Sequence, residues 1–438
     1  MITFEERTGP RLGVDYPSVT VPDWYRDAKL GIFTHWGIYS VPAFAVVHGG
    51  PVSAEDAYAQ HEYAEWYANT VRIAGSPTQR HHVATYGAGT TYEDLADAWH
   101  VPDAAASELV RQVLRSGARF IVPTTKHHDG FCLWNTSTTP FNSTRRGPRR
   151  DLIADLHRAS LAAGARFGIY FSGALDWHVS DFPPITSNDE LFAFRRNDDA
   201  FAGYAASQLN ELIDRFSPAV VWNDIDWPDA GKGPEEIGVA ALWRRYLDAV
   251  PDGLVNDRWG VPAHGVLTRE YVDVDHVLDH PWESTRGLGR SFGYNRAEDG
   301  DSMLSGSELI RHFVDVVAKN GNLLINVGPR ADGSLPENQL RPLVELGDWL
   351  AINGESVFGS RPWIRAADGP VRYTTTPGTV WCHHLEPAIG ELRLPPELSD
   401  ATSVRWVGAG EESVQAGFTP VPQTLRGVAV ASCGVTCP

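Results

Sequence analysis

Polar and aromatic side chains follow directly after several short apolar runs of the sequence. These groups are His35-Trp36, Lys126-His127-His128-Asp129, Asn223-Asp224 and Asn256-Asp257-Arg258. Carboxylates, imidazoles and a guanidinium supply fixed donors and acceptors for hydroxyl groups, and aromatic rings pack against apolar C–H faces. Trp66, Trp134 and Trp227 add rings near these groups, although tryptophan also fills protein cores. The mixture predicts a cleft for a neutral polyol such as a carbohydrate.

Hydrolysis of a glycosidic bond usually employs two carboxyl groups. In a retaining enzyme one attacks the sugar carbon, and the other first donates and then removes a proton. Asp224 ends an apolar run and suits a rigid nucleophile, whereas taken alone it fits equally well as the cap of the following turn. The sequence alone does not show which of Asp224 and Asp226 would be the nucleophile. For the second carboxyl group Glu270 and Glu283 compete, and a single glutamate in a loop is usually a surface residue.

The elements that must position these residues alternate between short apolar runs and longer helical patterns, which is typical of parallel βα units. The expected strands are 30–34, 120–125, 167–171, 220–223, 253–256 and 322–326. The expected helices are 104–116, 151–163, 199–216, 235–249 and 305–319. Asp151 is a predicted N-cap and Gly164 a predicted C-cap. In a parallel barrel the active site forms at the carboxyl ends of the strands, where these polar groups are expected to meet.

After Gly354 short alternating stretches replace this pattern. They cover 371–375, 380–383, 391–394, 403–407 and 427–431, and they predict a small antiparallel domain. We therefore predict an α/β fold with a (β/α)8-like, TIM-type catalytic barrel over residues 1–355 and a C-terminal antiparallel β-sandwich over residues 356–438. A chain of 438 residues has the length for both.

Ordered motifs along the chain resemble glycoside hydrolase family 29, the α-L-fucosidases. They are the segment 28–44, Glu65-Trp66-Tyr67, Lys126-His127-His128-Asp129-Gly130-Phe131, Trp222-Asn223-Asp224, Asn256-Asp257-Arg258-Trp259-Gly260, Ser291-Phe292-Gly293-Tyr294-Asn295 and 321–329. Together they span roughly residues 20 to 360. The resemblance implies a TIM-type barrel that hydrolyses terminal α-L-fucosides in exo fashion, with retention through a covalent fucosyl-enzyme. It implies no cofactor and no metal.

The resemblance also implies roles for individual residues. Asp224 resembles the family's nucleophile, and Glu270 resembles its general acid/base. The residues that resemble those holding the fucose hydroxyls are His35, Glu65, Trp66, His127, His128 and Arg258. Phe33 and Phe292 resemble the apolar wall that receives the C5 methyl group, a contact worth about 1–3 kcal/mol.

Two positions depart from the family pattern. Many members carry Gly-(Ile/Val)-Tyr-Tyr-Ser where this chain has Gly-Ile-Tyr-Phe-Ser at 168–172. Phe171 is expected beside the substrate and the nucleophile, where it lacks a tyrosine hydroxyl, and this predicts slower turnover. Asp226 adds a second negative charge beside Asp224.

Two other functions would use the same residues. A metal-dependent barrel hydrolase could bind zinc through His35, His127, His128 and Asp224, although adjacent histidines point to opposite sides of a strand. A catalytically silent protein would bind fucose in the cleft without turning it over. Signatures of other chemistries, namely a phosphate-binding loop, Gly-x-Ser-x-Gly and His-Glu-x-x-His, do not occur in the sequence.

The composition indicates which binding partners and which cellular compartment to expect. The formal net charge of -18 opposes binding to nucleic acid or to anionic membranes, and the one basic run, 145–150, is expected to be a solvated loop. Residues 1–12 do not resemble a signal peptide, and no apolar run reaches the ~20 residues of a membrane span. The four cysteines are Cys132, Cys382, Cys433 and Cys437, and their spacing indicates neither zinc binding nor a disulfide framework. We expect a cytoplasmic protein, and the sequence is compatible with a homo-oligomer.

Overall fold

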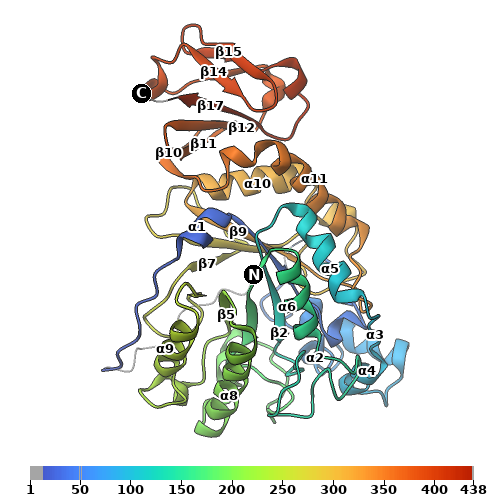
Figure 1. Ribbon diagram of the computed structural model, residues 1–438. Helices are drawn as coiled ribbons and strands as arrows, with labels where there is room; N and C mark the ends of the chain where they lie inside the picture. The colour runs from blue at the N-terminus through green and yellow to red at the C-terminus, as the bar shows by residue number, and fades with distance from the viewer. Residues whose placement is uncertain (1–12, 49, 51, 437–438) are drawn as a thin grey trace.

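Apolar runs, most of them buried along their whole length, form the strands of a parallel sheet in the computed structural model, which describes residues 13–48, 50 and 52–436. The strands are β1 (Leu30–Thr34), β2 (Phe120–Lys126), β3 (Arg166–Phe167), β4 (Ile169–Ser172), β5 (Val220–Asp224), β6 (Leu254–Val255), β7 (Leu267–Glu270), β8 (Trp282–Gly287) and β9 (Gly321–Val327). Their order is β6-β5-β4-β2-β1-β9-β8-β7, with β3 beside β2, and the pairs are parallel. The two ends of this order meet where the Val266 N–H donates to the Val255 carbonyl oxygen at 3.0 Å. The sheet therefore forms the predicted (β/α)8-like barrel (Figure 1).

Helices follow most of the barrel strands and lie outside the sheet (Figure 1). They are α1 (Asp23–Ala28), α2 (Tyr67–Thr70), α3 (Pro77–Tyr86), α4 (Tyr92–Ala98), α5 (Ala105–Val113), α6 (Leu152–Ala162), α7 (Asn188–Ala193), α8 (Asp199–Phe216), α9 (Val239–Ala249), α10 (Gly306–Ala318) and α11 (Glu337–Asn353). The bounds of α8 are those expected, and the Asp151 side chain caps α6 by accepting from the Ala154 N–H. The C-cap of α6 is Ala163, and Gly164, the predicted C-cap, is the next residue and has φ of 76°. Loops, not helices, connect β6 to β7 and β7 to β8 in the part of the chain that the structure describes.

The C-terminal strands form the predicted antiparallel sandwich. A six-stranded sheet has the order β10-β11-β12-β17-β14-β15, from β10 (Arg361–Asp368), β11 (Val371–Thr376), β12 (Thr379–His384), β14 (Ser403–Trp406), β15 (Gly410–Ser413) and β17 (Ala431–Thr436). A second pair joins β13 (Glu391–Arg393) to β16 (Phe418–Pro420). These strands enclose their own apolar core, and they lie beyond α10 and α11 in Figure 1. The Trp349 indole N–H of α11 donates to the Val430 carbonyl oxygen at 2.9 Å and ties the two parts together.

Several expected bounds differ from those of the structure. The strand expected at 167–171 is interrupted at Gly168, where a Cβ atom would lie 2.9 Å from the Val220 Cβ. The strand expected at 427–431 lies at 431–436, and the helix expected from residue 235 begins at Val239, after a turn that ends at Gly238. Strands β7 and β8 were not predicted because Leu267–Glu270 and Trp282–Gly287 are rich in polar residues.

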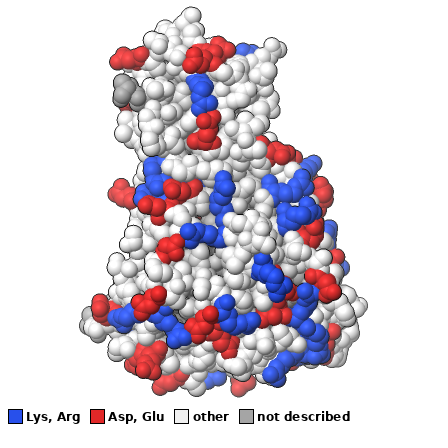
Figure 2. All heavy atoms as spheres, viewed as in Figure 1, with Lys and Arg blue, Asp and Glu red and all other residues white. Residues whose placement is uncertain are grey.

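Two of the four arginines in the basic run at 145–150, Arg146 and Arg150, form ion pairs. Arg146 pairs with Glu93 at 3.1 Å and with Asp97 at 2.6 Å, and Arg150 pairs with Asp103 at 2.6 Å. Figure 2 likewise shows basic and acidic side chains interleaved over the visible face of the barrel. In residues 13–48, 50 and 52–436 no helix is both long and apolar enough to cross a membrane. The expectations for residues 1–12 and for Cys437 lie outside the described residues.

Candidate active site

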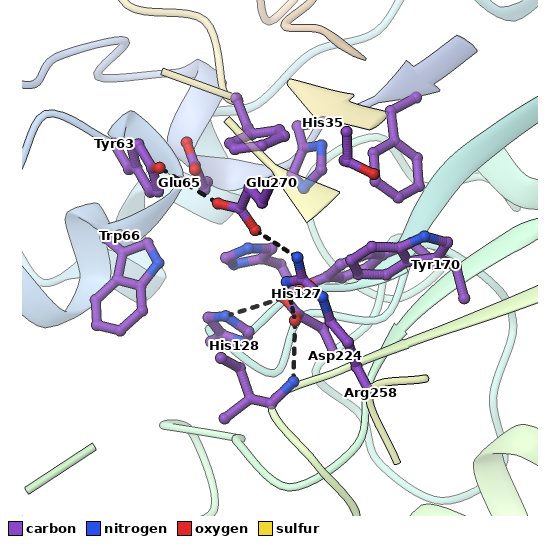
Figure 3. Close-up of a pocket in the computed structure, with 15 residues that line it drawn as sticks. His35, Tyr63, Glu65, Trp66, His127, His128, Tyr170, Asp224, Arg258 and Glu270 are labelled. Carbon is purple, nitrogen blue, oxygen red and sulfur yellow. Dashed lines mark hydrogen bonds and ion pairs between the residues drawn. The ribbon is translucent and has the colours of Figure 1, made fainter. Parts of the chain in front are cut away.

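A cavity of about 450 Å³, including its open mouth, lies at the carboxyl ends of the barrel strands. Its walls come from Phe33, His35, Tyr63, Glu65, Trp66, His127, His128, Tyr170, Trp222, Asp224, Ile225, Arg258, Glu270, Thr285 and Phe292. The predicted site residues therefore meet in one place, with the exception of Phe171 (Figure 3). Tyr63, Tyr170, Ile225 and Thr285 were not predicted, although Tyr170 and Ile225 directly adjoin residues that were.

Asp224 at the end of β5 is held on both carboxylate oxygens. Oδ2 accepts the Tyr170 hydroxyl at 2.8 Å, and Oδ1 accepts Arg258 Nη1 at 3.1 Å and the Ile225 N–H at 3.0 Å. The Asp224 side chain is 12% exposed, on the cavity side. This is the geometry of a carboxylate fixed in orientation by a rigid strand and still open to a ligand.

Glu270 at the end of β7 shares a guanidinium with Asp224. Arg258 Nη2 donates to Glu270 Oε2 at 2.8 Å, while Nη1 of the same group contacts Asp224, so one planar side chain bridges both carboxylates (Figure 3). The Tyr63 hydroxyl donates to Glu270 Oε1 at 3.3 Å. Burial opposes the charge of Arg258, but the carboxylates of Glu270 and Asp224 outweigh it and raise the Arg258 pKa. Arg258 therefore stays cationic between the two acids.

Glu283, the competing second carboxyl group, does not line the cavity. It is fully buried inside the barrel, where Tyr25 donates to Oε2 at 2.5 Å and the Trp222 indole N–H donates to Oε1 at 2.9 Å. Burial raises the pKa of Glu283 to about 7, an effect that these two donors partly offset. Its contacts hold the Trp222 ring, over which Arg258 Cζ lies at 4.7 Å.

Two histidines present unprotonated nitrogens to the cavity. Asn326 Nδ2 donates to the Phe292 carbonyl oxygen at 2.7 Å, so Asn326 Oδ1 is the acceptor for His35 Nδ1 at 2.6 Å. Burial lowers the pKa of His35 to about 4, so His35 is neutral near pH 7 and its Nε2 carries a lone pair. A substrate hydroxyl can donate to that nitrogen.

His128 is held in the same way as His35, with its Nδ1 bound by a protein acceptor. Ser172 Oγ donates to the Leu175 carbonyl oxygen at 2.8 Å and accepts from His128 Nδ1 at 2.7 Å. Burial lowers the pKa of His128 to about 4, although Asp224 partly opposes this. His128 Nε2, 3.8 Å from Asp224 Oδ2, is therefore an acceptor near neutral pH and not the cation of an ion pair.

Glu65, in the short 3₁₀ turn Ala64–Trp66, is buried in the wall opposite Asp224 (Figure 3). Its Oε2 accepts the Gly293 N–H at 2.7 Å and the Ser291 hydroxyl at 3.4 Å. Burial raises the pKa of Glu65 to about 8, and Glu270 adds to the shift, while the Gly293 N–H opposes it. Near pH 7 the carboxyl group is therefore protonated and can donate to a ligand hydroxyl.

The prediction that Phe171 faces the substrate was wrong. Side chains alternate across a strand, and in β4 the Tyr170 ring faces the cavity whereas Phe171 lies on the other side, 4.5 Å from Lys126 Nζ. The hydroxyl that Phe171 lacks would therefore not reach Asp224. The negative charge that Asp226 adds beside Asp224 is paired with two cations, Arg195 Nη1 at 3.2 Å and Lys232 Nζ at 2.9 Å.

The expectation that His127 and His128 point apart was also wrong. Both follow the end of β2 rather than lying within it, their ring centroids are 4.0 Å apart, and both line the cavity. Even so, Nδ1 of His35 and of His128 is already engaged by a protein acceptor. Among the described residues, no three His, Cys, Asp or Glu side chains are arranged to hold a metal ion.

Comparison with known proteins shows the family to which the chain belongs. The Alpha-L-fucosidase family model matches residues 15–355. The Alpha-L-fucosidase of Dictyostelium discoideum is 33% identical over 428 residues, which cover 93% of this chain and 88% of the relative. A solved alpha-L-fucosidase superposes with a TM-score of 0.89 at 40% identity, covering 96% of this chain and 98% of the other. The Thermotoga maritima alpha-fucosidase solved in complex with fucose gives a TM-score of 0.84 at 38% identity, covering 95% and 97%. The fold, the cavity and these matches agree, and the chain belongs to the alpha-L-fucosidase family of glycoside hydrolases.

Proposed function

We propose that this fucosidase is exo-acting and retaining, with Asp224 as nucleophile and Glu270 as general acid/base. The observation that carries the proposal is the Arg258 bridge, with one guanidinium 3.1 Å from Asp224 and 2.8 Å from Glu270. A shared guanidinium brings the two carboxyl groups together at one side chain, which is compatible with the ~5–5.5 Å gap of retaining enzymes.

In the first step Asp224 attacks the anomeric carbon, and its C–O bond to the sugar forms as the bond to the leaving oxygen breaks. Glu270 donates its proton to that oxygen. In the second step Glu270 removes a proton from water, which attacks the same carbon and releases Asp224 as a carboxylate. Two inversions at one carbon give net retention.

The cavity walls suit a terminal fucose. His35 Nε2 and His128 Nε2 accept from hydroxyl groups, and protonated Glu65 donates to one. Phe33 and Phe292 supply an apolar surface for the C5 methyl group. That the Thermotoga maritima relative is solved with fucose supports this assignment.

Azide rescue tests the two roles separately. In Asp224→Gly, hydrolysis of an aryl α-L-fucoside should be lost, and azide should restore a single displacement that yields β-fucosyl azide. In Glu270→Ala, azide should instead attack the covalent intermediate and yield α-fucosyl azide. Glu283→Gln is the matched control, because Glu283 is buried away from the cavity and should give no azide adduct.

Activity, product stereochemistry, fucose binding and chelation together test the alternatives. Full activity in Asp224→Gly would refute the nucleophile, and proton NMR that shows β-fucose as the first product would refute retention. Binding of fucose without turnover by the wild-type protein would favour the silent fucose-binding protein. Loss of activity on chelation would favour the metal-dependent hydrolase.

We also propose a reducing, cytoplasmic location. Cys132, Cys382 and Cys433 are buried free thiols in the structure, and structural disulfides are rare in that compartment. Fractionation of cells that produce the untagged protein tests this, and recovery in a secreted fraction would contradict it.

A further inference from the structure

The chain immediately after Asp224 runs through two residues with positive φ. Ile225 has φ of 54° and Asp226 has φ of 74°. A β-branched residue is rare in this region, because its side chain crowds the backbone, so the turn persists only where its surroundings hold it. The turn directs the Ile225 N–H to Asp224 Oδ1 at 3.0 Å and places the Ile225 side chain in the cavity wall.

A buried ion cluster holds this turn from the side away from the cavity. Arg195 Nη1 donates both to the Ile225 carbonyl oxygen and to Asp226 Oδ2, each at 3.2 Å. Lys232 Nζ lies 2.9 Å from Asp226 Oδ1, which also accepts the Trp227 N–H at 2.7 Å. The side chains of Asp226, Arg195 and Lys232 are 10%, 6% and 5% exposed. The peptide groups on both sides of Asp226 are therefore bound by buried charged side chains: the Ile225 carbonyl oxygen by Arg195, and the Trp227 N–H by Asp226.

The same turn anchors the segment that carries Arg258. The Asp226 N–H donates to the Arg258 carbonyl oxygen at 3.2 Å. Asn223 Nδ2 donates to the carbonyl oxygens of Asp226 and Arg258, each at 2.9 Å. A shift of Asp226 would thus move two donors of Asp224, the Ile225 N–H and the Arg258 guanidinium.

Two neighbouring glycines leave room for Asp226, Gly260 for its carboxylate and Gly173 for its carbonyl oxygen. A Cβ atom at Gly260 would lie 1.7 Å from Asp226 Oδ1, and one at Gly173 would lie 2.4 Å from the Asp226 carbonyl oxygen. The chain therefore accommodates the carboxylate in a specific position.

We propose that Asp226, with Arg195 and Lys232, is a positioning residue of the fucosidase reaction. It holds the strained turn that sets the Ile225 N–H and Arg258 against Asp224, and it touches no substrate. The inference rests on the proposed function, in which Asp224 is the nucleophile.

The test compares Asp226→Ala with Asp229→Asn. Asp229 contacts the same Lys232 Nζ at 2.8 Å but is 55% exposed and does not touch the turn, so it is a matched control. A displacement on the order of 1 Å at a reacting group costs about 100-fold in rate. We expect kcat on an aryl α-L-fucoside to fall about 100-fold in Asp226→Ala. KM and the inhibition constant of fucose should change less than kcat, because His35, Glu65 and Phe292 line the cavity without contacting the turn. Asp229→Asn should keep the wild-type kcat.

Two further variants keep the test informative if Asp226→Ala does not fold. Asp226→Asn preserves volume and removes the charge, and Arg195→Ala removes the side chain that contacts both the Ile225 carbonyl oxygen and Asp226. Both should lower kcat more than they raise KM. The double variant Asp226→Ala/Arg195→Ala should lose much less kcat than the product of the two single losses, because both changes remove the same ion pair from the turn.

A folded Asp226→Ala with wild-type kcat would overturn the proposal, as would a loss confined to KM or an equal loss in Asp229→Asn. Azide rescue of Asp224→Gly separates the two levels of inference. If azide rescues that variant while Asp226→Ala is fully active, only the positioning role fails. If Asp224→Gly keeps full activity, the proposed function itself fails.

Discussion

Removal of the Tyr170 hydroxyl tests how Asp224 is held during turnover. That hydroxyl donates to Asp224 Oδ2 at 2.8 Å from a buried ring. Burial, with the charge of Asp224 adding to it, raises the Tyr170 pKa well above its ordinary value, so the group remains a donor throughout the assay range. Tyr170→Phe deletes one oxygen and leaves the ring stacked on Trp222, at a centroid distance of 5.6 Å.

In the proposed mechanism, the expected loss arises in the second chemical step. As Asp224 leaves the sugar it regains its negative charge, and a hydrogen bond to a charged group contributes about 1.5–3 kcal/mol. At about 1.4 kcal/mol per decade, release of the covalent intermediate should slow by about tenfold to 150-fold. The first step should slow less, because Asp224 loses charge there. Stopped-flow measurements with an aryl α-L-fucoside should therefore show a burst of phenolate equal to the enzyme concentration, followed by slow turnover.

Phe171→Tyr is the control for this prediction. Its new hydroxyl would lie near Lys126, on the far side of β4 from the cavity, so kcat should not rise. Wild-type kcat in a folded Tyr170→Phe would refute the role assigned to the hydroxyl. A clear gain in kcat for Phe171→Tyr would show that the sequence-based expectation about Phe171 was correct after all.

Three further predictions concern pH, specificity and packing. Because the pKa of Glu65 is raised to about 8, its proton is present below that pH and lost above it, so KM for a fucoside should rise as pH passes about 8, and Glu65→Gln should flatten this rise. Phe292→Ala should lower the ratio of kcat/KM for aryl α-L-fucoside over α-L-galactoside by about tenfold to 200-fold, since it removes part of the methyl-binding wall. Gly31→Ala places a Cβ atom 2.2 Å from the Phe120 ring and should lower the free energy of unfolding by about 1–3 kcal/mol. Gly203→Ala, in α8 with open space around it, should raise the free energy of unfolding by up to about 1 kcal/mol. Denaturant titration measures both changes.

The predicted parts of the barrel are those in which burial is continuous. All residues of β1, β2, β5 and β9 are buried, so their apolar runs are visible in the sequence. By contrast, β7 carries Glu270 but has only one buried residue, Thr268, and its sequence is typical of a polar loop. The position of Glu270 therefore could not be derived from pattern and depended on the family resemblance.

The alternation of side chains along β4 explains why Phe171 was wrongly expected to face the cavity. Sequence predicts that a strand ends near 171 but not which of two adjacent residues faces inward. The register decides it: Tyr170 pairs with Trp222, and Phe171 pairs with Asn223. Because Trp222 and Asp224 lie on the inner face of β5, Tyr170 must face the cavity as well. A cross-strand register, which depends on contacts distant in sequence, was the missing information.

The two carboxyl groups differ in restraint in the way that their proposed roles require. Asp224 ends a fully buried strand, and Tyr170, Ile225 and Arg258 donate to its oxygens. A nucleophile benefits from this restraint, because the reacting oxygen must meet the anomeric carbon in one orientation. Glu270 lies on a partly exposed strand, and its side chain is 19% exposed against 12% for Asp224. A general acid/base needs that access, because it must reach a leaving oxygen in one step and a water molecule in the next. In the proposed mechanism the more restrained strand end therefore forms the bond to the sugar, and the more open one transfers the proton.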